Sequence, residues 1–273
     1  MYLGRLPRAL FAFAVLVGLA FIYVPLAVVI VNSFNASKVF SWPPRQFTTR
    51  WWTAALENDG VRAALLTSVR AGLGATLIAV LLGTALSFAL VRYDFFGRSA
   101  VNFLVVLPIS LPGIVTGIAL NTSFTTLLRP FGISLGLFTV VLGHATFCIV
   151  VVYNNVSARL RRTGTSLDEA SADLGASLWQ TFRYVTMPQL RSAIVAGALL
   201  AFALSFDEIV VTTFTAGPGV QTLPQWIFNN LFRPNQGPIV NAVAALLLIV
   251  FVVPVWLAER LSGSDRTSVG GRV

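Results

Sequence analysis

Residues that carry out catalysis or bind metal ions are scarce in this sequence. Among 273 residues there is one histidine, His144, and one cysteine, Cys148, so an intramolecular disulfide is excluded. A metal site would have to be built from carboxylates, of which there are 10, whereas zinc sites combine several Cys and His ligands. The sequence shows no pairing of a nucleophile with a base and no spacing typical of metal ligands. We therefore expect no catalytic residue, no metal site and no cofactor bound by this chain.

The adjacent carboxylates of Asp207 and Glu208 are the exception, because they interrupt a long apolar segment. Acidic side chains in such surroundings can bind a cation or exchange a proton. Successive residues of a helix point about 100° apart, so we expect only one of the two to face a pathway fully. Whether Asp207 and Glu208 can bind a cation depends on the secondary-structure elements that carry them.

The composition identifies those elements as membrane helices. Hydrophobic residues make up 56% of the chain and charged residues 11%, whereas soluble domains carry roughly 25% charged residues. A membrane-spanning helix needs ~20 apolar residues, because the hydrocarbon core is ~30 Å thick. Five of the uncharged runs can hold a span without help, and the run from Ser192 is long enough only with Asp207 and Glu208 inside the membrane. The runs are residues 9–37, 71–91, 99–128, 130–158, 192–206, 209–232 and 234–258.

These runs predict an all-α, polytopic membrane protein with a single transmembrane domain over residues 1–273. Arg5 and Arg8 precede the first run as in a signal peptide, but the run exceeds a ~7–15-residue signal core, so we expect a retained first helix. Pro108 and Pro112-Gly113 should kink or break the third span. The six expected spans are residues 9–32, 63–90, 99–123, 136–158, 192–213 and 238–258.

The basic residues predict the orientation in the membrane. Six spans place both termini on one side. Of the 19 basic residues, twelve lie on that side and seven on the other. Because cytoplasmic loops are enriched in Lys and Arg, both termini are expected in the cytoplasm. The net charge of +9 does not indicate nucleic acid, since the basic residues flank apolar runs, where they suit lipid headgroups.

The expected cytoplasmic loop, residues 159–191, contains two predicted short helices. Ser166 and Glu169 have the spacing of a capping box, in which each side chain bonds the backbone N–H of the other residue. Ser177 and Gln180 repeat that spacing at the start of the second helix. The loop is therefore predicted to be a helix pair.

This helix pair is predicted to expose an apolar face. Leu167, Ala170 and Leu174 lie on one side of the first helix. Gly175 separates the two helices, and Pro188 should end the second helix before the fifth span. Exposed apolar residues in the cytosol need a partner. On these residues alone, that partner is either the membrane surface or another protein.

The residues from Glu169 to Gly175, with Pro188 further on, resemble the EAA motif of binding-protein-dependent ABC permeases. That motif reads Glu-Ala-Ala, three residues, Gly, nine residues, Ile, one residue, Leu-Pro. Glu169, Ala170, Gly175 and Pro188 match at the family spacing. The conservative departures are Ser171, Val185 and Met187. The coupling residues that the resemblance implies are Ser166, Leu167, Glu169, Ala170, Ser171, Leu174, Gly175 and Pro188.

The resemblance also implies a mechanism and a set of partners. The helix pair would sit in a groove on an ATPase subunit. Closure of the ATPase dimer would then rock the membrane helices between inward- and outward-facing states. No G-x-x-x-x-G-K-[ST] phosphate loop occurs in this chain, so ATP would be bound by the partner. The other implied partners are a second permease subunit, an extracytoplasmic substrate-binding protein and membrane lipid.

Residues 30–35, 47–52 and 204–218 resemble the spermidine/putrescine-type permeases, and in particular the second permease subunit of that system. The similarity covers nearly the whole chain. It implies uptake of a polyamine or a related small cation. Import of iron(III), sulfate or an opine remains an alternative within the same class.

The intramembrane polar residues leave their roles open. A carboxylate at the bilayer centre costs ~2.5–3.5 kcal/mol, so Asp207 and Glu208 are expected to face a pathway or a partner. A pathway carboxylate suits a cationic polyamine. The alternatives are a salt bridge to Arg70 or to the second permease, or a position near the outer interface. Asn121 and Asn241 are expected either to line the pathway or to form interhelical hydrogen bonds.

Two other function classes compete with the importer. An autonomous proton- or ion-coupled carrier could use Asp207 and Glu208, but inverted repeats are not visible and the cytosolic helix pair would be unexplained. A membrane enzyme would need a catalytic pairing, which this sequence does not offer.

Overall fold

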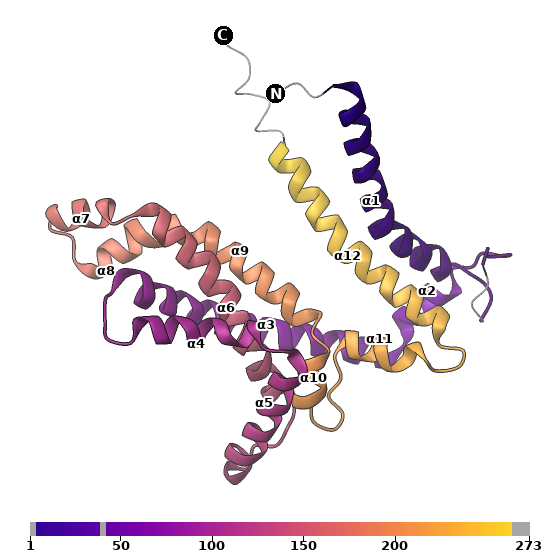
Figure 1. The fold of residues 1–273 in the computed structure, drawn as a ribbon. Helices are drawn as coiled ribbons and strands as arrows, with labels where there is room; N and C mark the ends of the chain where they lie inside the picture. The colour runs from indigo at the N-terminus through magenta and orange to yellow at the C-terminus, as the bar shows by residue number, and fades with distance from the viewer. Residues whose placement is uncertain (1–3, 39–41, 264–273) are drawn as a thin grey trace. The chain divides into compact units, whose positions relative to one another are not determined.

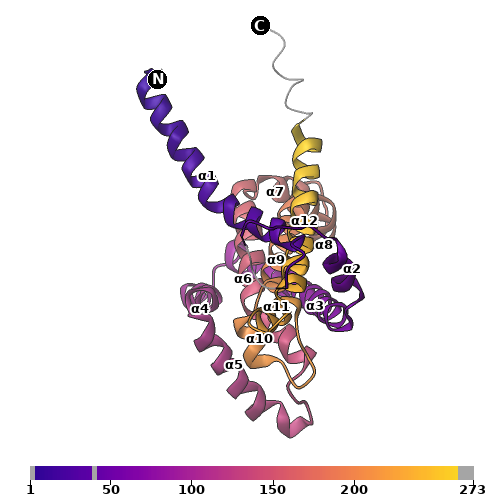
Figure 2. The same ribbon diagram turned by 90° about the vertical axis from the view of Figure 1, so that its right-hand side faces the viewer.

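The computed structural model describes the backbone of residues 4–38 and 42–263 (Figure 1 and Figure 2). Within these residues the structure is helical, apart from an isolated antiparallel bridge between Asn35 and Phe47. In chain order the helices are α1 (Arg5–Ser33), α2 (Arg50–Glu57), α3 (Asp59–Arg92), α4 (Arg98–Ser110), α5 (Gly113–Leu127), the 3-10 helix η1 (Arg129–Phe131), α6 (Leu137–Thr163), α7 (Ser166–Asp173), α8 (Leu178–Gln180), the π-helix η2 (Thr181–Thr186), α9 (Met187–Phe206), α10 (Val210–Thr215), α11 (Leu223–Leu231) and α12 (Gly237–Gly263).

The helices form two compact units. The terminal unit comprises residues 1–62 and 227–273, and the central unit comprises residues 63–226. The all-α, polytopic fold is confirmed, while the single transmembrane domain over residues 1–273 stays a prediction. Two of the twelve basic residues that were counted on the side of the termini, Arg266 and Arg272, lie outside the described residues.

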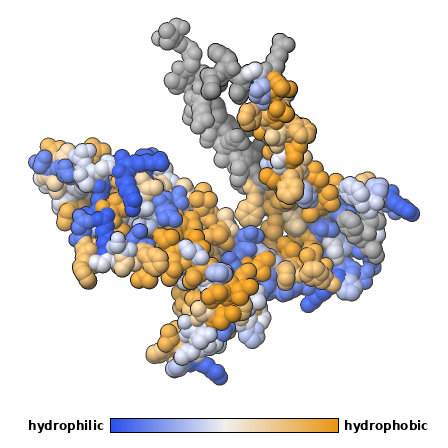
Figure 3. Space-filling view, viewed as in Figure 1, coloured by the Kyte–Doolittle hydropathy of each residue, from blue (hydrophilic) through white to orange (hydrophobic). Residues whose placement is uncertain are grey.

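The terminal unit is built around α12, which packs against both α1 and α2. Most side chains of α1 are exposed, including Phe21 at 84%. Figure 3 shows that this helix presents a hydrophobic surface along its length. Such a surface is stable against lipid hydrocarbon and unfavourable in water. We therefore infer that α1 contacts lipid or another membrane helix.

The apolar helices account for four of the six predicted spans, or five if one bent pair of helices is counted as a span. Four segments are long and apolar enough to cross a membrane, and the pair α4 and α5 qualifies together although it is bent by 109°. The part of α12 whose side chains are described, Gly237–Phe251, is a shorter apolar helix. The bend falls at Pro112, as predicted, because Leu111 before it is extended. Pro108 lies inside α4 without ending it. The four segments are Leu6–Ser33, Asp59–Arg92, Leu137–Thr163 and Leu178–Phe206.

The central unit is organised around α6, which packs against α9, α4 and α10. Its contact with α3 is made through small residues, as in many membrane helix pairs. A Cβ added at Gly83 would lie 2.9 Å from the Ile149 carbonyl oxygen, so the two backbones meet there. One turn further on, Ser87 Oγ donates to the Tyr153 carbonyl at 3.1 Å. These contacts hold α3 tightly against α6.

The fifth span is broken, which corrects the prediction of one helix over residues 192–213. The helix α9 ends at Phe206, and α10 begins at Val210. Asp207 caps the end of α9, and Glu208 lies between the two helices. The prediction extended the helix through the two carboxylates because the flanking residues are apolar. The carboxylates instead mark a break, where side-chain oxygens can replace missing helical hydrogen bonds.

Candidate functional site

The predicted helix pair is present as α7 and α8, at a different end of the central unit from α5 (Figure 1 and Figure 2). Gly175 joins them with φ at +81°, a left-handed conformation that favours glycine. The Gly175 N–H donates to the Ala172 carbonyl at 2.8 Å, and the Ala176 N–H donates to the Ser171 carbonyl at 3.1 Å. These are the two hydrogen bonds of a Schellman motif. Gly175 therefore has a local structural reason to be glycine.

The two predicted capping boxes have different outcomes. The box at Ser177 and Gln180 is confirmed, with the Ser177 N–H donating to Gln180 Oε1 at 2.8 Å. The box at Ser166 and Glu169 is wrong. Thr165 is the N-cap, and its carbonyl accepts from the Glu169 N–H at 2.9 Å. Because the helix starts one residue earlier than its Ser-x-x-Glu spacing requires, Ser166 is already inside the first turn.

Pro188 does not end the second helix, which is a further correction. Helical backbone runs from Leu178 to Phe206, and Pro188 is the second residue of α9. A proline cannot donate to the carbonyl four residues back. The preceding π-helical turn accommodates this, since the Met187 N–H bonds the Phe182 carbonyl five residues back. The chain thus passes from the loop into the membrane without a break.

The helix pair exposes an apolar surface. Leu174 and Leu178 are 89% and 91% exposed, and Leu167, Trp179 and Tyr184 are also largely exposed. Ala170 and Glu169 are exposed as well. A hollow of about 350 Å³ lies between the two helices. Its lining residues are Ser171, Leu174, Gly175, Ala176, Gln180, Tyr184 and Val185. Exposed apolar side chains beside a hollow are typical of a surface that a partner covers.

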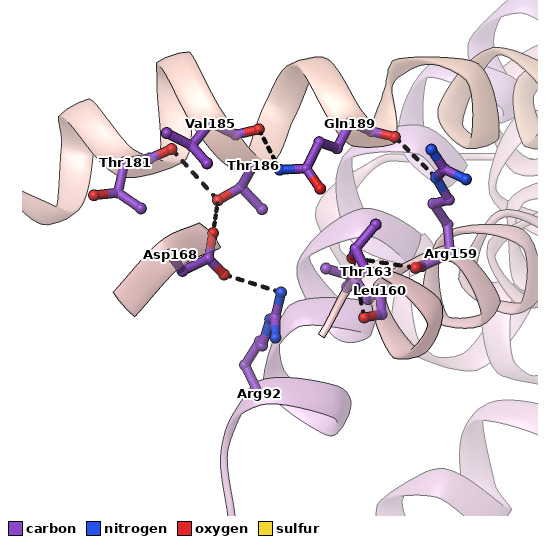
Figure 4. A network of polar contacts seen from close by, with 9 residues as sticks. All are labelled: Arg92, Arg159, Leu160, Thr163, Asp168, Thr181, Val185, Thr186 and Gln189. Atoms are coloured by element: carbon purple, nitrogen blue, oxygen red, sulfur yellow. Dashed lines mark hydrogen bonds and ion pairs between the residues drawn. The ribbon is translucent and has the colours of Figure 1, made fainter. Parts of the chain in front are cut away.

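Beneath this surface, polar side chains tie α7 to its neighbours (Figure 4). Asp168 Oδ2 pairs with Arg92 Nη2 at 2.9 Å, and Asp168 Oδ1 accepts from Thr186 Oγ1 at 2.9 Å. Ser171 Oγ lies 3.0 Å from Thr181 Oγ1. Ser171 departs from the motif by its hydroxyl, and that hydroxyl has a partner here.

Sequence reasoning did not identify Arg92, Asp168, Thr181 or Thr186 as parts of this site. Arg92 is the last residue of α3 and is distant in the sequence from Asp168. A capped helix can be read from local spacing, whereas an ion pair between the ends of two helices depends on how the helices pack. No local pattern in this sequence signals the pair.

The break in the fifth span places Asp207 and Glu208 in different surroundings. Asp207 is exposed, whereas Glu208 is half-buried and its Oε1 accepts from the Val211 N–H at 2.8 Å. The Glu208 side chain thus satisfies a backbone N–H in the first turn of α10, whose N-cap residue is Ile209. The ion pairs among the described residues are Arg92–Asp168 and Arg98–Asp94, so neither carboxylate forms the alternative pair with Arg70.

His144, the one histidine, bridges the two sides of this break. It is fully buried, with Nδ1 at 2.7 Å from Ser205 Oγ on α9 and Nε2 at 2.9 Å from Thr212 Oγ1 on α10. Thr212 Oγ1 in turn donates to the Glu208 carbonyl at 2.7 Å. The imidazole thus fixes the geometry of the break. This role could not be predicted from the sequence, because a single histidine forms no recognisable pattern with its distant partners.

The two predicted polar lining residues lie in different units. Asn121 Nδ2 donates to the Phe214 carbonyl at 2.6 Å, which is an interhelical hydrogen bond from α5 to α10. Asn241 is half-buried on α12 and lines a small pocket in the terminal unit together with Asn32 and Lys38. Among the described residues, no group of three or more His, Cys, Asp or Glu side chains is placed to hold a metal ion.

Comparison with known proteins identifies the class. The family described as binding-protein-dependent transport system inner membrane component matches residues 75–262. The crystal structure of a bacterial ABC transporter involved in the import of the acidic polysaccharide alginate has the same fold. Its TM-score is 0.71 at 15% identity, over 95% of this chain and 99% of that chain. This chain belongs to the family of binding-protein-dependent inner membrane permease components.

Two curated relatives from Escherichia coli (strain K12) narrow the comparison. The putrescine transport system permease protein PotI is 36% identical over 237 residues, which is 85% of this chain and 83% of that protein. The spermidine/putrescine transport system permease protein PotC is 35% identical over 266 residues, which is 97% of each protein. The resemblance inferred from the sequence is confirmed. The chain is thus the membrane-spanning permease component of a transport system.

Proposed function

We propose that this chain is one of two permease subunits of an ABC importer for a polyamine or a related small cation. The observation that carries the proposal is its similarity to putrescine and spermidine/putrescine permeases over 83–97% of their length. The exposed carboxylate of Asp207 at the break in the fifth span fits a cationic solute. The second permease would complete the pathway, and an extracytoplasmic binding protein would deliver the solute.

We further propose that α7 and α8 lie in the cytoplasm and contact a dimer of ATPase subunits. Two features support this. The excess of basic residues on the side of α7 favours the cytoplasm. The exposed leucines around Gly175 offer an apolar surface that fits a groove on a partner. ATP would be bound and hydrolysed by the partner, since this chain has no phosphate loop. The permease would convert closure of the ATPase dimer into rocking of its helices.

Reconstitution in proteoliposomes tests this assignment. The complete complex, with second permease, ATPase and binding protein, is expected to accumulate labelled putrescine or spermidine when ATP is supplied. This chain alone should neither hydrolyse ATP nor accumulate the solute. If unlabelled sulfate or iron(III), and not unlabelled polyamine, reduced uptake of the label, the transporter would be assigned to that other solute. Uptake by this chain alone would contradict the importer assignment.

Asp207→Asn is expected to weaken polyamine uptake without loss of complex assembly. Removing one charge from the pathway should raise the KM for uptake about fivefold, as for a loss of about 1 kcal/mol of charge–charge attraction. The measurement is initial uptake rate against polyamine concentration, at equal amounts of purified complex. Asp59→Asn, which removes an exposed carboxylate at the start of α3, is the control. Unchanged kinetics in Asp207→Asn would remove Asp207 from the pathway.

A further inference from the structure

The coupling helix α7 is joined to its neighbours in the chain by glycine on both sides. Gly164 connects it to α6 with φ at +62°, and Gly175 connects it to α8 with φ at +81°. A Cβ added at either glycine would meet no atom within 4 Å, so neither joint is braced by packing. Glycine permits a wide range of backbone angles. The covalent connections alone would therefore let α7 swivel when a partner pushes on it.

The side chain of Asp168 joins α7 to neighbouring elements, in addition to the turn hydrogen bonds at Gly175 and the contact of Ser171 with Thr181. Its two oxygens contact two different elements, Arg92 at the end of α3 and Thr186 in η2, each at 2.9 Å (Figure 4). The side chains of Arg92 and Asp168 are only 14% and 26% exposed, and Thr186 is buried. Partial burial weakens solvent screening of the ion pair. One carboxylate thus joins α7 to α3 and to the start of the fifth span.

The end of α3 is a firm attachment point. Gly83 brings the backbone of α3 against α6, and Ser87 bonds across the same contact. Close-packed helices transmit a displacement as a unit. Arg92 lies fewer than three helical turns beyond Gly83 on α3. A force applied to α7 can therefore reach the α3–α6 pair through Arg92, although α3 is far from α7 in the sequence.

We propose that Asp168 is the positioning residue that makes α7 a rigid lever, and that its ion pair with Arg92 carries the motion of α7 into α3. The inference rests on the proposed function, in which α7 receives motion from an ATPase. The ion pair would give the motion of α7 a second path into the membrane helices, separate from the covalent connections of α7 to α6 and α9. Without the ion pair, ATP hydrolysis continues while the membrane helices respond less.

A double-mutant cycle in the reconstituted complex tests the ion pair. Asp168→Asn and Arg92→Gln are each expected to lower solute uptake per ATP hydrolysed about tenfold, within the range of coupling energies between sites. The Asn variant can still accept the hydrogen bond from Thr186, so it isolates the contact with Arg92. The double variant should be no worse than either single variant, because residues that act through one contact are not additive.

The exposed ion pair between Asp94 and Arg98 provides a matched control close to Arg92. The Asp94 side chain is 92% exposed, and exposed pairs contribute little. Asp94→Asn should leave uptake per ATP unchanged. The double variant Arg92→Asp with Asp168→Arg, which exchanges the two charges, should have an uptake-to-hydrolysis ratio several-fold higher than either single variant. A purely structural role for Asp168 would lower the yield of assembled complex and would leave the uptake-to-hydrolysis ratio of that complex unchanged.

A second measurement does not depend on substituting the ion pair. Spin labels at Tyr93→Cys and Ala172→Cys, both exposed positions, report the distance between the end of α3 and α7. We expect one narrow distance distribution that is the same in ATP-free and nucleotide-trapped complexes. A distribution that broadens or shifts between those states would overturn the inference, as would an unchanged uptake-to-hydrolysis ratio in both single variants.

These outcomes separate the inference from the function on which it rests. If the unmodified complex shows no ATP-dependent uptake, the proposed importer function fails. If Gly175→Asp transports normally, the proposed contact of α7 with the ATPase fails. If uptake is normal and sensitive to Gly175→Asp but indifferent to Asp168→Asn and Arg92→Gln, the lever inference alone fails.

Discussion

Gly175→Asp is expected to abolish ATP-dependent uptake while the complex still assembles in the membrane. Position 175 has φ at +81°, where a residue with a Cβ is strained by about 1–2 kcal/mol. The added side chain meets no atom of this chain within 4 Å, so the unit should still fold. The carboxylate would instead project beside the hollow and the exposed leucines where we place the ATPase. The measurement is uptake of labelled polyamine, with assembly followed by co-purification of the subunits.

Gly132→Asp is the matched control for this variant. Gly132 also has a left-handed backbone, with φ at +78°, and also has no atom within 4 Å of an added Cβ. It follows η1, beyond the end of α5, away from α7 (Figure 1). Because the backbone strain is similar, uptake by Gly132→Asp should stay within about twofold of the unmodified complex. If both variants lost uptake equally, backbone strain, and not contact with a partner, would explain the effect at Gly175.

The substitution His144→Leu is expected to reduce strongly the amount of correctly assembled complex. The substitution leaves the buried hydroxyl of Ser205 without its partner on α6 and removes the tie between Thr212 and α6. A buried polar group without a partner costs about 1–3 kcal/mol. The break between α9 and α10 would also lose the side chain that fixes its two sides. Fluorescence-detected gel filtration after heating should show a lower midpoint temperature and less assembled protein.

A second substitution separates the lost hydrogen bonds from a change in side-chain shape. The pair His144→Leu with Ser205→Ala removes both partners of one hydrogen bond. Such a double change is less costly than leaving one partner orphaned, so part of the stability should return. Full stability in the single variant His144→Leu would contradict the role that we give to the imidazole.

The features that the sequence predicted correctly depend on short stretches of chain. The turn at Gly175 and the cap at Ser177 involve residues within a few positions of each other. The bend at Pro112 follows from the effect of proline on the residue before it. The length of an apolar run is also a short-range feature, and four such segments form helices long enough to cross a membrane.

The features that the sequence missed depend on packing or on competing local signals. Pro188 reads as a helix end, but a π-helical turn ahead of it lets the helix continue into α9. The apolar neighbours of Asp207 and Glu208 predicted a continuous helix, whereas α9 ends before them and the Glu208 side chain bonds the first turn of α10. The contacts of His144 and of Asp168 join residues far apart in the chain, and only the packed helices bring them together.

A photo-crosslinking residue at position 169, on the exposed first turn of α7, tests most directly whether this helix is the place where ATP-derived motion enters the permease. In the complete transporter, illumination is predicted to join this chain to the ATPase subunit, and a membrane-impermeant thiol reagent outside intact cells should not reach Glu169→Cys. Labelling of that cysteine from outside, or crosslinks that never include the ATPase, would contradict this account of how the permease is driven.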